Sequence, residues 1–300
     1  MAATIVVNGL RKTYGDVRAV DGVSLEVPQG EFFGILGPNG AGKTTTLEII
    51  EGLREPDEGE VKVFGMSPWP RRYELLRKIG VQLQASSFFE RLTAREQIQT
   101  FGALYGVTPR RADEMLEMVG LTDKANTRVE QLSGGQAQRL SIACALVHDP
   151  ELVFLDEPSS GLDPQARRNL WDVLREINTE GRTIVLTTHY MDEAETLCER
   201  VAIMDNGAIL RMGAPAALVR DLDAPVRISV ESGVLSAEQA HGLPSVEKVT
   251  DDGVSLVIAT RDASAVVAAL VDKGALNGVQ VKGATLEDVF LDLTGREYRA

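Results

Sequence analysis

The sequence predicts an α/β fold over residues 1–222 and a smaller α+β domain over residues 223–300. Two apolar runs, residues 31–36 and 152–155, show little polar alternation, which is typical of strands covered on both faces of a parallel sheet. A glycine-rich turn and a helical pattern follow the first run, and this order of strand, turn and helix indicates an α/β protein. After about Asp223 the composition changes, and shorter strands alternate with two helices.

The composition is that of a globular protein of 300 residues, with 44% hydrophobic residues, 25% charged residues and a net charge of -13. Such an acidic chain lacks the excess of Lys and Arg that a phosphate backbone requires, so we expect no nucleic-acid partner. No apolar run approaches the ~20 residues of a spanning helix and no signal-peptide pattern opens the sequence, so we expect a cytosolic chain. Cys144 and Cys198 each stand in a helical pattern and are expected to be buried, reduced thiols.

The first apolar run leads into the sequence GPNGAGKTT. Residues 4–7 and 23–27 are predicted strands before it, with a polar loop around Tyr14 between them. The run itself fits a phosphate loop, in which glycines let backbone N–H groups approach phosphates and the lysine places a cation beside them. The hydroxyl that follows the lysine can ligate Mg²⁺. The residues concerned are Gly37, Pro38, Asn39, Gly40, Ala41, Gly42, Lys43, Thr44 and Thr45.

The next segment predicts a strand at residues 60–64, a short basic helix at 71–78 and a strand at 79–84. A glutamine that leaves such a strand could reach a metal or a water, or it could be a plain polar strand end. Residues 93–119 are predicted to be helical, beginning at a capping-box pattern and broken around Gly106 and Pro109.

Residues 132–164 combine two kinds of chemistry. Ser133, Gly134, Gly135 and Gln136 stand at a predicted helix start, where free N–H groups favour an anion, although an ordinary helix cap is an open alternative. The strand at 152–155 then ends in Asp156 and Glu157, which suits a metal and a water, although surface acids at a strand end are also common.

Further elements continue the α/β pattern. Pro164 begins a helix to about residue 180, the strand at 182–188 ends in His189, and residues 201–212 form a hairpin around Asn206-Gly207. Residues 226–282 then give the order βαββαβ, and a final helix carries an apolar stripe of Leu286, Val289, Phe290 and Leu293. This stripe is expected either to pack on its own domain or to form a dimer contact.

The order of phosphate loop, strand-end glutamine, LSGGQ, acidic strand and histidine resembles the ATP-binding cassette (ABC) family across about residues 4–220. LSGGQ is the decisive element, because other phosphate-loop classes lack it. The tail, LEDVFL followed by LTGR, looks like the C-terminal extension of the drug-resistance branch of bacterial ABC-2 type exporters.

The resemblance implies a role for each matched residue. Tyr14 would stack on adenine, the phosphate loop would cradle the phosphates of ATP, and Mg²⁺ would lie among Thr44, Gln84 and Asp156. Glu157 would polarise the attacking water and His189 would contact the γ-phosphate. Asp163 would lie between two cassettes, and residues 133–136 would close over the ATP of the other cassette.

The glutamine position departs from the family pattern. Relatives often have proline before it, whereas this chain has Leu83 there and a second glutamine at Gln82. Strand alternation and the distance to the next helix favour Gln84, with Gln82 as the alternative. The loop that follows, with Phe88 and Phe89, is where relatives receive a helix of the membrane partner.

The resemblance implies an ATPase that energises export through a separately encoded integral-membrane permease. Two copies, or two paired cassettes, would close on ATP, peripheral to the inner face of the cell membrane. A soluble cassette ATPase that acts in assembly, on ribosomes or on nucleic acid is the alternative. A nucleotide kinase or GTPase is a third possibility, but it would leave LSGGQ unexplained.

Overall fold

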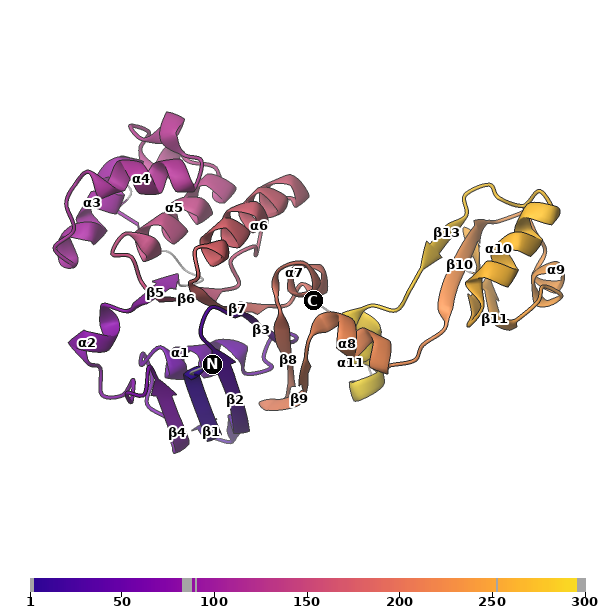
Figure 1. Ribbon diagram of the computed structural model, residues 1–300, viewed down its shortest axis with the longest axis horizontal. Helices are drawn as coiled ribbons and strands as arrows, with labels where there is room; N and C mark the ends of the chain where they lie inside the picture. The colour runs from indigo at the N-terminus through magenta and orange to yellow at the C-terminus, as the bar shows by residue number, and fades with distance from the viewer. Residues whose placement is uncertain (1–2, 83–87, 90, 252, 296–300) are drawn as a thin grey trace. The chain divides into compact units, whose positions relative to one another are not determined.

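The computed structural model describes residues 3–82, 88–89, 91–251 and 253–295 (Figure 1). The chain divides into two compact units between Pro215 and Ala216. The helix that starts at this point, α8 (Pro215–Asp221), ends close to the boundary that the composition indicates. Each unit has an apolar core of its own.

The centre of the first unit is a six-stranded sheet with the strand order β5-β6-β7-β3-β8-β9. Its first five strands are parallel, and β9 pairs antiparallel with β8. Every residue of β3, β6 and β7 is buried, which explains why β3 and the first four residues of β6 show no polar alternation. The strands are β3 (Phe32–Leu36), β5 (Ile79–Gln82), β6 (Leu152–Asp156), β7 (Thr183–Thr188), β8 (Arg200–Asp205) and β9 (Ala208–Gly213).

A second sheet in this unit is antiparallel, with the order β2-β1-β4. The strands β1 (Ala3–Tyr14), β2 (Val17–Pro28) and β4 (Glu58–Val63) include far more residues than the sequence predicts for the first two. The predicted loop around Tyr14 is wrong, because β1 continues to Tyr14 and only a two-residue turn follows. Polar residues stand on the solvated face of this hairpin, so the apolar pattern fades before the strands end.

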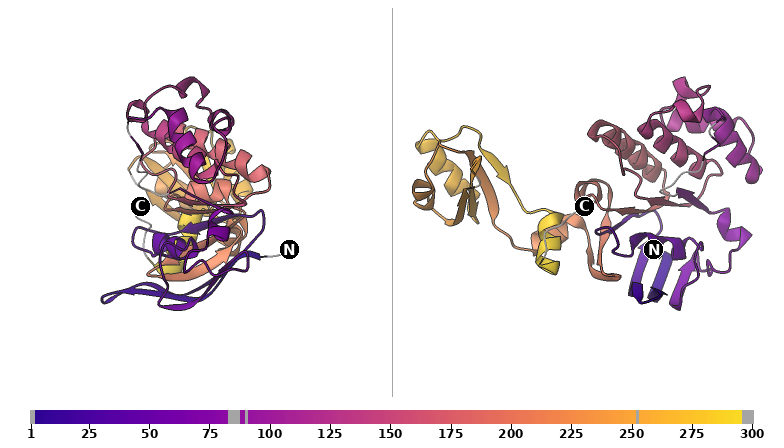
Figure 2. Two further views of the ribbon diagram at one scale, coloured as in Figure 1. Left: turned by 90° about the vertical axis from the view of Figure 1, so that its left-hand side faces the viewer. Right: turned by 180° about the vertical axis from the view of Figure 1, so that it is seen from behind.

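Helices cover the sheets and form a separate group beyond them. Figure 1 shows α3, α4 and α5 gathered away from the antiparallel sheet, and Figure 2 repeats this grouping from behind. The break between α3 and α4 confirms the interruption predicted at Gly106, whereas the basic segment 71–78 forms only a four-residue helix. Helix α7 ends directly before Cys198, where the sequence indicates a helical pattern without giving its bounds. The helices are α1 (Lys43–Ile50), α2 (Tyr73–Leu76), α3 (Ala94–Leu104), α4 (Arg111–Met118), α5 (Gly134–Leu146), α6 (Pro164–Thr179) and α7 (Met191–Leu197).

The second unit confirms the predicted order βαββαβ. Its four antiparallel strands have the order β11-β12-β10-β13, and its apolar core runs from Ile228 to Ala275. The final helix α11 has three residues of its stripe buried, Leu286, Val289 and Phe290. The elements are β10 (Val226–Glu231), α9 (Ala237–His241), β11 (Val246–Asp251), β12 (Ser255–Thr260), α10 (Ala263–Asp272), β13 (Gln280–Lys282) and α11 (Leu286–Thr294).

Two further expectations concern the chain as a whole. Cys144 and Cys198 are both buried and free, as predicted, and burial raises the pKa of Cys144 to about 12. Within the described ranges, the chain has no helix whose length and apolar content would let it cross a membrane.

Candidate functional site

Three parallel strands of the six-stranded sheet end side by side. In the register of the sheet, Leu36 of β3 stands opposite Thr188 of β7, and Asp156 of β6 stands opposite Thr187. The residues that follow these strands are the glycine-rich loop, Glu157 and His189. The sheet therefore brings most of the predicted site residues to one edge, where ligands of open α/β sheets bind.

At the two ends of the glycine-rich loop, the surrounding backbone leaves no room for a side chain larger than that of glycine. A Cβ atom on Gly37 would lie 2.3 Å from the carbonyl oxygen of Met204, and one on Gly42 would lie 2.2 Å from that of Ala19. Gly42 also has a positive φ of 99° and immediately precedes α1. The loop thus leads directly into a helix N-terminus, whose first N–H groups have no partner within the helix and attract anions.

Lys43 is held inside this loop. Its Nζ donates hydrogen bonds to the carbonyl oxygens of Gly37 and Pro38, at 2.9 and 3.2 Å, and lies 3.1 Å from Oε1 of Glu157. The lysine side chain is 4% exposed and that of the glutamate 8%. A cation is therefore fixed inside the loop, next to the acidic residue that follows β6.

Asp156 accepts hydrogen bonds from two threonines. Its Oδ1 accepts from Oγ1 of Thr44 at 3.1 Å and from Oγ1 of Thr187. Burial raises the pKa of Asp156, and the two hydroxyl donors partly offset this rise because they stabilise the ionised form. A carboxylate beside a hydroxyl is a ligand pair that suits Mg²⁺, so the residues present fit the metal that the sequence predicts.

Glu157 is held by its backbone as well as by its side chain. Its φ is 47°, which is unusual for a residue other than glycine, and its N–H donates to Oγ1 of Thr187 at 3.0 Å. Its Oε2 lies 3.1 Å from Nδ1 of His189. The carboxylate is thus positioned between Lys43 and His189 at the strand edge.

The LSGGQ segment lies at a second place. Ser133 caps α5 through a capping box with Gln136, and Asp163 caps α6 by accepting from the N–H groups of Gln165 and Ala166. A cavity of about 220 Å³ lies between these two helix starts, and none of the described phosphate-loop residues lines it. A Cβ on Gly135 would lie 3.0 Å from that of Ala166, which explains the close approach of α5 and α6 here.

The remaining predicted residues are Tyr14 and Gln84, with Gln82 as the alternative to Gln84. Tyr14 is 40% exposed at the end of β1, with the guanidinium of Arg54 5.3 Å from its ring centre and Nζ of Lys12 at 5.8 Å. Gln84 lies outside the described residues. Gln82 ends β5 and is buried opposite Leu155, one residue before Asp156.

Two contributors were missed in the sequence. Thr187 binds both Asp156 and the N–H of Glu157, and it is fully buried. Glu193 on α7 accepts from the indole N–H of Trp171 at 3.0 Å, and burial raises its pKa. The paired threonines before His189 were the available signal for the first, because hydroxyls at the end of a buried strand require partners.

Comparisons with known proteins agree with this geometry. The family model described as ABC transporter matches residues 20–160. The Nod factor export ATP-binding protein I of Paraburkholderia xenovorans is 41% identical over 300 residues, which cover 98% of this chain and 98% of that protein. The protein of the same name from a Rhizobium species is 40% identical over 96% of both chains.

Solved structures give the same result. A dimeric ATP-binding cassette in a post-hydrolysis state, bound to ADP and Pi, has a TM-score of 0.64 and 32% identity, over 70% of this chain and 98% of that one. A Clostridium perfringens subunit of an ABC transporter complex has a TM-score of 0.66 and 27% identity, over 74% and 95%. The relatives named for export do not favour the non-transport alternative. The chain therefore belongs to the ATP-binding cassette (ABC) transporter family, in which it is an ATP-binding and ATP-hydrolysing subunit.

Proposed function

We propose that two copies of this chain, or this chain and a paired cassette, close on two ATP molecules and drive export through a separate integral-membrane permease. The proposal is supported by the two distinct places described above. The strand edge with Lys43 and Glu157 has the groups that one ATP requires, whereas Ser133 and Asp163 lie around another cavity. Residues 133–136 would then complete the site of the opposite cassette.

The phosphate loop binds ATP in this proposal. Residues 37–45 supply N–H groups and the Lys43 cation, and Tyr14 stacks on the adenine. Thr44 and Asp156, with a loop glutamine, hold Mg²⁺, which supplies positive charge against the phosphate oxygens when bound. Gln84 is the proposed glutamine and Gln82 the alternative.

Glu157 polarises the attacking water, and His189 contacts the γ-phosphate. Phosphoryl transfer depends mainly on position and on charge stabilisation, which explains why one cation, one acid and a helix N-terminus are sufficient machinery. The 3.1 Å contact between Nδ1 of His189 and Oε2 of Glu157 fixes the direction of that carboxylate.

The permease is proposed because the relatives are named as ATP-binding proteins of an exporter and extend over nearly the whole chain. It would hold the subunit peripherally on the inner face of the membrane. The face around Phe88, between β5 and the α3–α5 group, is the proposed docking face. The second unit, which lacks the phosphate-loop and acidic motifs, is proposed to be an accessory domain with a regulatory or dimerisation role.

The observation that carries the proposal is the alignment of Lys43, Asp156 and Glu157 at one sheet edge. It is tested by measuring ATP hydrolysis by the chain alone and with the permease encoded beside it, reconstituted in lipid. We expect Mg²⁺-dependent hydrolysis that the permease changes. Hydrolysis that is indifferent to every co-encoded membrane protein would contradict the export role.

A further inference from the structure

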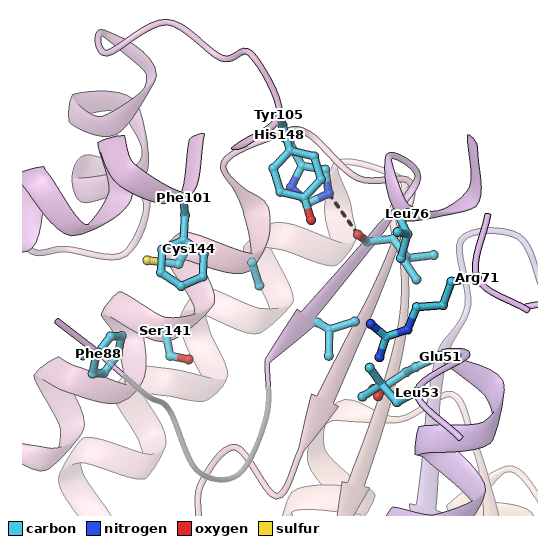
Figure 3. Close-up of a pocket in the computed structure, with 13 residues that line it drawn as sticks. Glu51, Leu53, Arg71, Leu76, Phe88, Phe101, Tyr105, Ser141, Cys144 and His148 are labelled. Carbon is cyan, nitrogen blue, oxygen red and sulfur yellow. Dashed lines mark hydrogen bonds between the residues drawn. The ribbon is translucent and has the colours of Figure 1, made fainter. Parts of the chain in front are cut away.

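A cavity of about 310 Å³ opens where the end of α1 faces the α3–α5 group (Figure 3). Its lining is largely apolar, with the rings of Phe88, Phe101 and Tyr105 on one side and the aliphatic chains of Leu53 and Leu76 on the other. An apolar lining alone would accept any apolar side chain. The polar groups in the wall determine which hydrogen-bonding or charged groups an occupant must have.

Glu51 is the acidic group in this wall. It follows α1, is 2% exposed, and its Oε1 has no hydrogen-bond partner in the part of the chain that the structure describes. Glu48, three residues earlier on the same helix, instead accepts from Nε of Arg54 at 2.6 Å. Burial raises the pKa of Glu51 to about 8. A buried carboxyl of this kind costs free energy until a donor reaches it.

Among the described residues, neither Arg71 nor His148 is hydrogen-bonded to Glu51. Arg71 donates its Nε to the carbonyl oxygen of Gly52 at 3.0 Å, and among the described residues no ion pair joins it to Glu51. His148 stacks on Tyr105, and its Nε2 lies 2.9 Å from the carbonyl oxygen of Ile79. Nε2 must then donate, so Nδ1 is an acceptor, and it too has no partner within the described ranges.

The cavity therefore has two buried polar atoms without a hydrogen-bond partner among the described residues, Oε1 of Glu51 and Nδ1 of His148. A purely apolar occupant would seal Glu51 away from water without a partner, which is the costly case. A cationic side chain would favour the ionised form of Glu51, bind it, and also suit the acidic net charge of this chain. Arginine and lysine combine such a head with an apolar stem that can lie along the rings.

We propose that this cavity receives a segment of the permease that carries an arginine or lysine, and that this basic side chain binds Glu51. This proposal rests on the proposed function, because it names the kind of permease side chain that the proposed docking face binds. It makes Glu51 a determinant of which permease this subunit accepts.

The test compares binding of the permease by three forms of the full-length chain. The permease that copurifies with the wild-type chain is reconstituted in lipid nanodiscs, and its dissociation constant is measured with wild type, Glu51→Gln and Glu48→Gln. We expect Glu51→Gln to weaken binding about tenfold or more, since truncation of one partner of a buried charge pair has at least this effect. Glu48→Gln, whose partner Arg54 belongs to this chain, should bind within about twofold of the wild type.

A scan of the permease identifies the partner side chain. Each cytoplasmic lysine and arginine is changed to glutamine, and one of these changes should weaken binding as much as Glu51→Gln, with no further loss when the two are combined. Unchanged circular dichroism and an unchanged or raised urea midpoint would show that Glu51→Gln is folded.

The possible failures are distinct. If the wild-type chain binds no membrane protein, the proposed function fails and this inference fails with it. If wild type and Glu51→Gln bind the permease equally, only the inference is overturned, and the same holds if no basic residue of the permease is coupled to Glu51.

Discussion

The Nζ atom of Lys43 lies 3.1 Å from Oε1 of Glu157, and both side chains are almost completely buried. The residue proposed to neutralise phosphate and the residue proposed to polarise water are therefore direct neighbours. His189 contacts the other oxygen of the same carboxylate. In the proposed mechanism, this glutamate links the cation that binds phosphate to the histidine that contacts it.

Glu157→Gln separates the two functions. The amide keeps the shape of the side chain, so ATP should bind with little change in affinity. Hydrolysis should fall by about 10²–10⁴-fold, or about 3–5 kcal/mol of transition-state stabilisation, because the general base is lost. Binding of a fluorescent ATP analogue and release of phosphate check the two parts. Turnover at the wild-type rate would contradict the role of Glu157.

Lys43→Met tests the pair itself. The change removes the cation at the phosphates, so affinity for ATP should fall strongly. It also leaves Glu157 buried without its cation, which should lower the free energy of unfolding by about 3–5 kcal/mol. The double variant Lys43→Met/Glu157→Gln should recover most of this stability in urea unfolding while ATP binding stays lost. Additive losses would show that the 3.1 Å contact does not contribute to stability.

Ser133→Arg tests the shared site. Ser133 is exposed and lines a cavity that contains none of the described phosphate-loop residues, so a single chain should still bind ATP. Closure and hydrolysis should fall, because a bulky cation would stand where the opposite ATP is proposed to bind. Ser236, which caps α9 with the same capping box, provides the matched control Ser236→Arg. Loss of ATP binding by the monomeric Ser133→Arg chain would argue against a shared site.

Thr187→Val removes the hydroxyl that joins Asp156 to the N–H of Glu157. A group that orients a metal ligand typically contributes about 10–100-fold to metal affinity or activity. We expect the Mg²⁺ concentration for half-maximal hydrolysis to rise about tenfold or more. Thr183→Val, which removes a hydroxyl at the opposite end of β7, should leave this concentration unchanged. Equal Mg²⁺ dependence of the two variants would contradict the orienting role of Thr187.

Glu51 should make stability depend on pH. Its pKa is raised from 4.5 to about 8, first by burial and then by Asp156 and Glu48. Between these pH values the folded chain keeps a proton that the unfolded chain releases, so this residue lowers stability as pH rises. Glu51→Gln cannot titrate, and its advantage over wild type should grow by about 4 kcal/mol from pH 5 to pH 8.

Urea unfolding measures this difference conveniently, because both tryptophans, Trp69 and Trp171, lie in the first unit. Arg71 and His148 line the same cavity in both proteins, so the comparison isolates Glu51. Parallel stability profiles would contradict the raised pKa.

The sequence predicts what local patterns encode. A buried strand such as β3, followed by its glycine-rich loop, has a composition that few other structures share and can be recognised in the sequence. The order of strands and helices in the second unit can be recognised in the same way. Tyr14 was misplaced because the solvated hairpin has a weak apolar pattern. The helical pattern before Cys198 gave no bounds for α7, because its seven residues contain three acids and little periodicity.

In the candidate site, too, local motifs can be predicted from the sequence and contacts between distant residues cannot. Its phosphate loop is a local motif, whereas Thr187 acquires its role only when β6 and β7 pair in register. Glu51 belongs to an ordinary helix end in the sequence. Its isolation from water depends on residues up to about a hundred positions away, among them Ser141 and Ala145. The spacing of residues along the chain does not predict that these side chains surround Glu51.

The core of the second unit consists of its own side chains, from Ile228 to Ala275, and none of them belongs to the core cluster of the first unit. A substitution in the core of the tail therefore removes no side chain from the core cluster of the ATPase unit. Such a tail can diverge or be replaced over evolution at a pace of its own, while the residues that handle ATP stay under separate constraint.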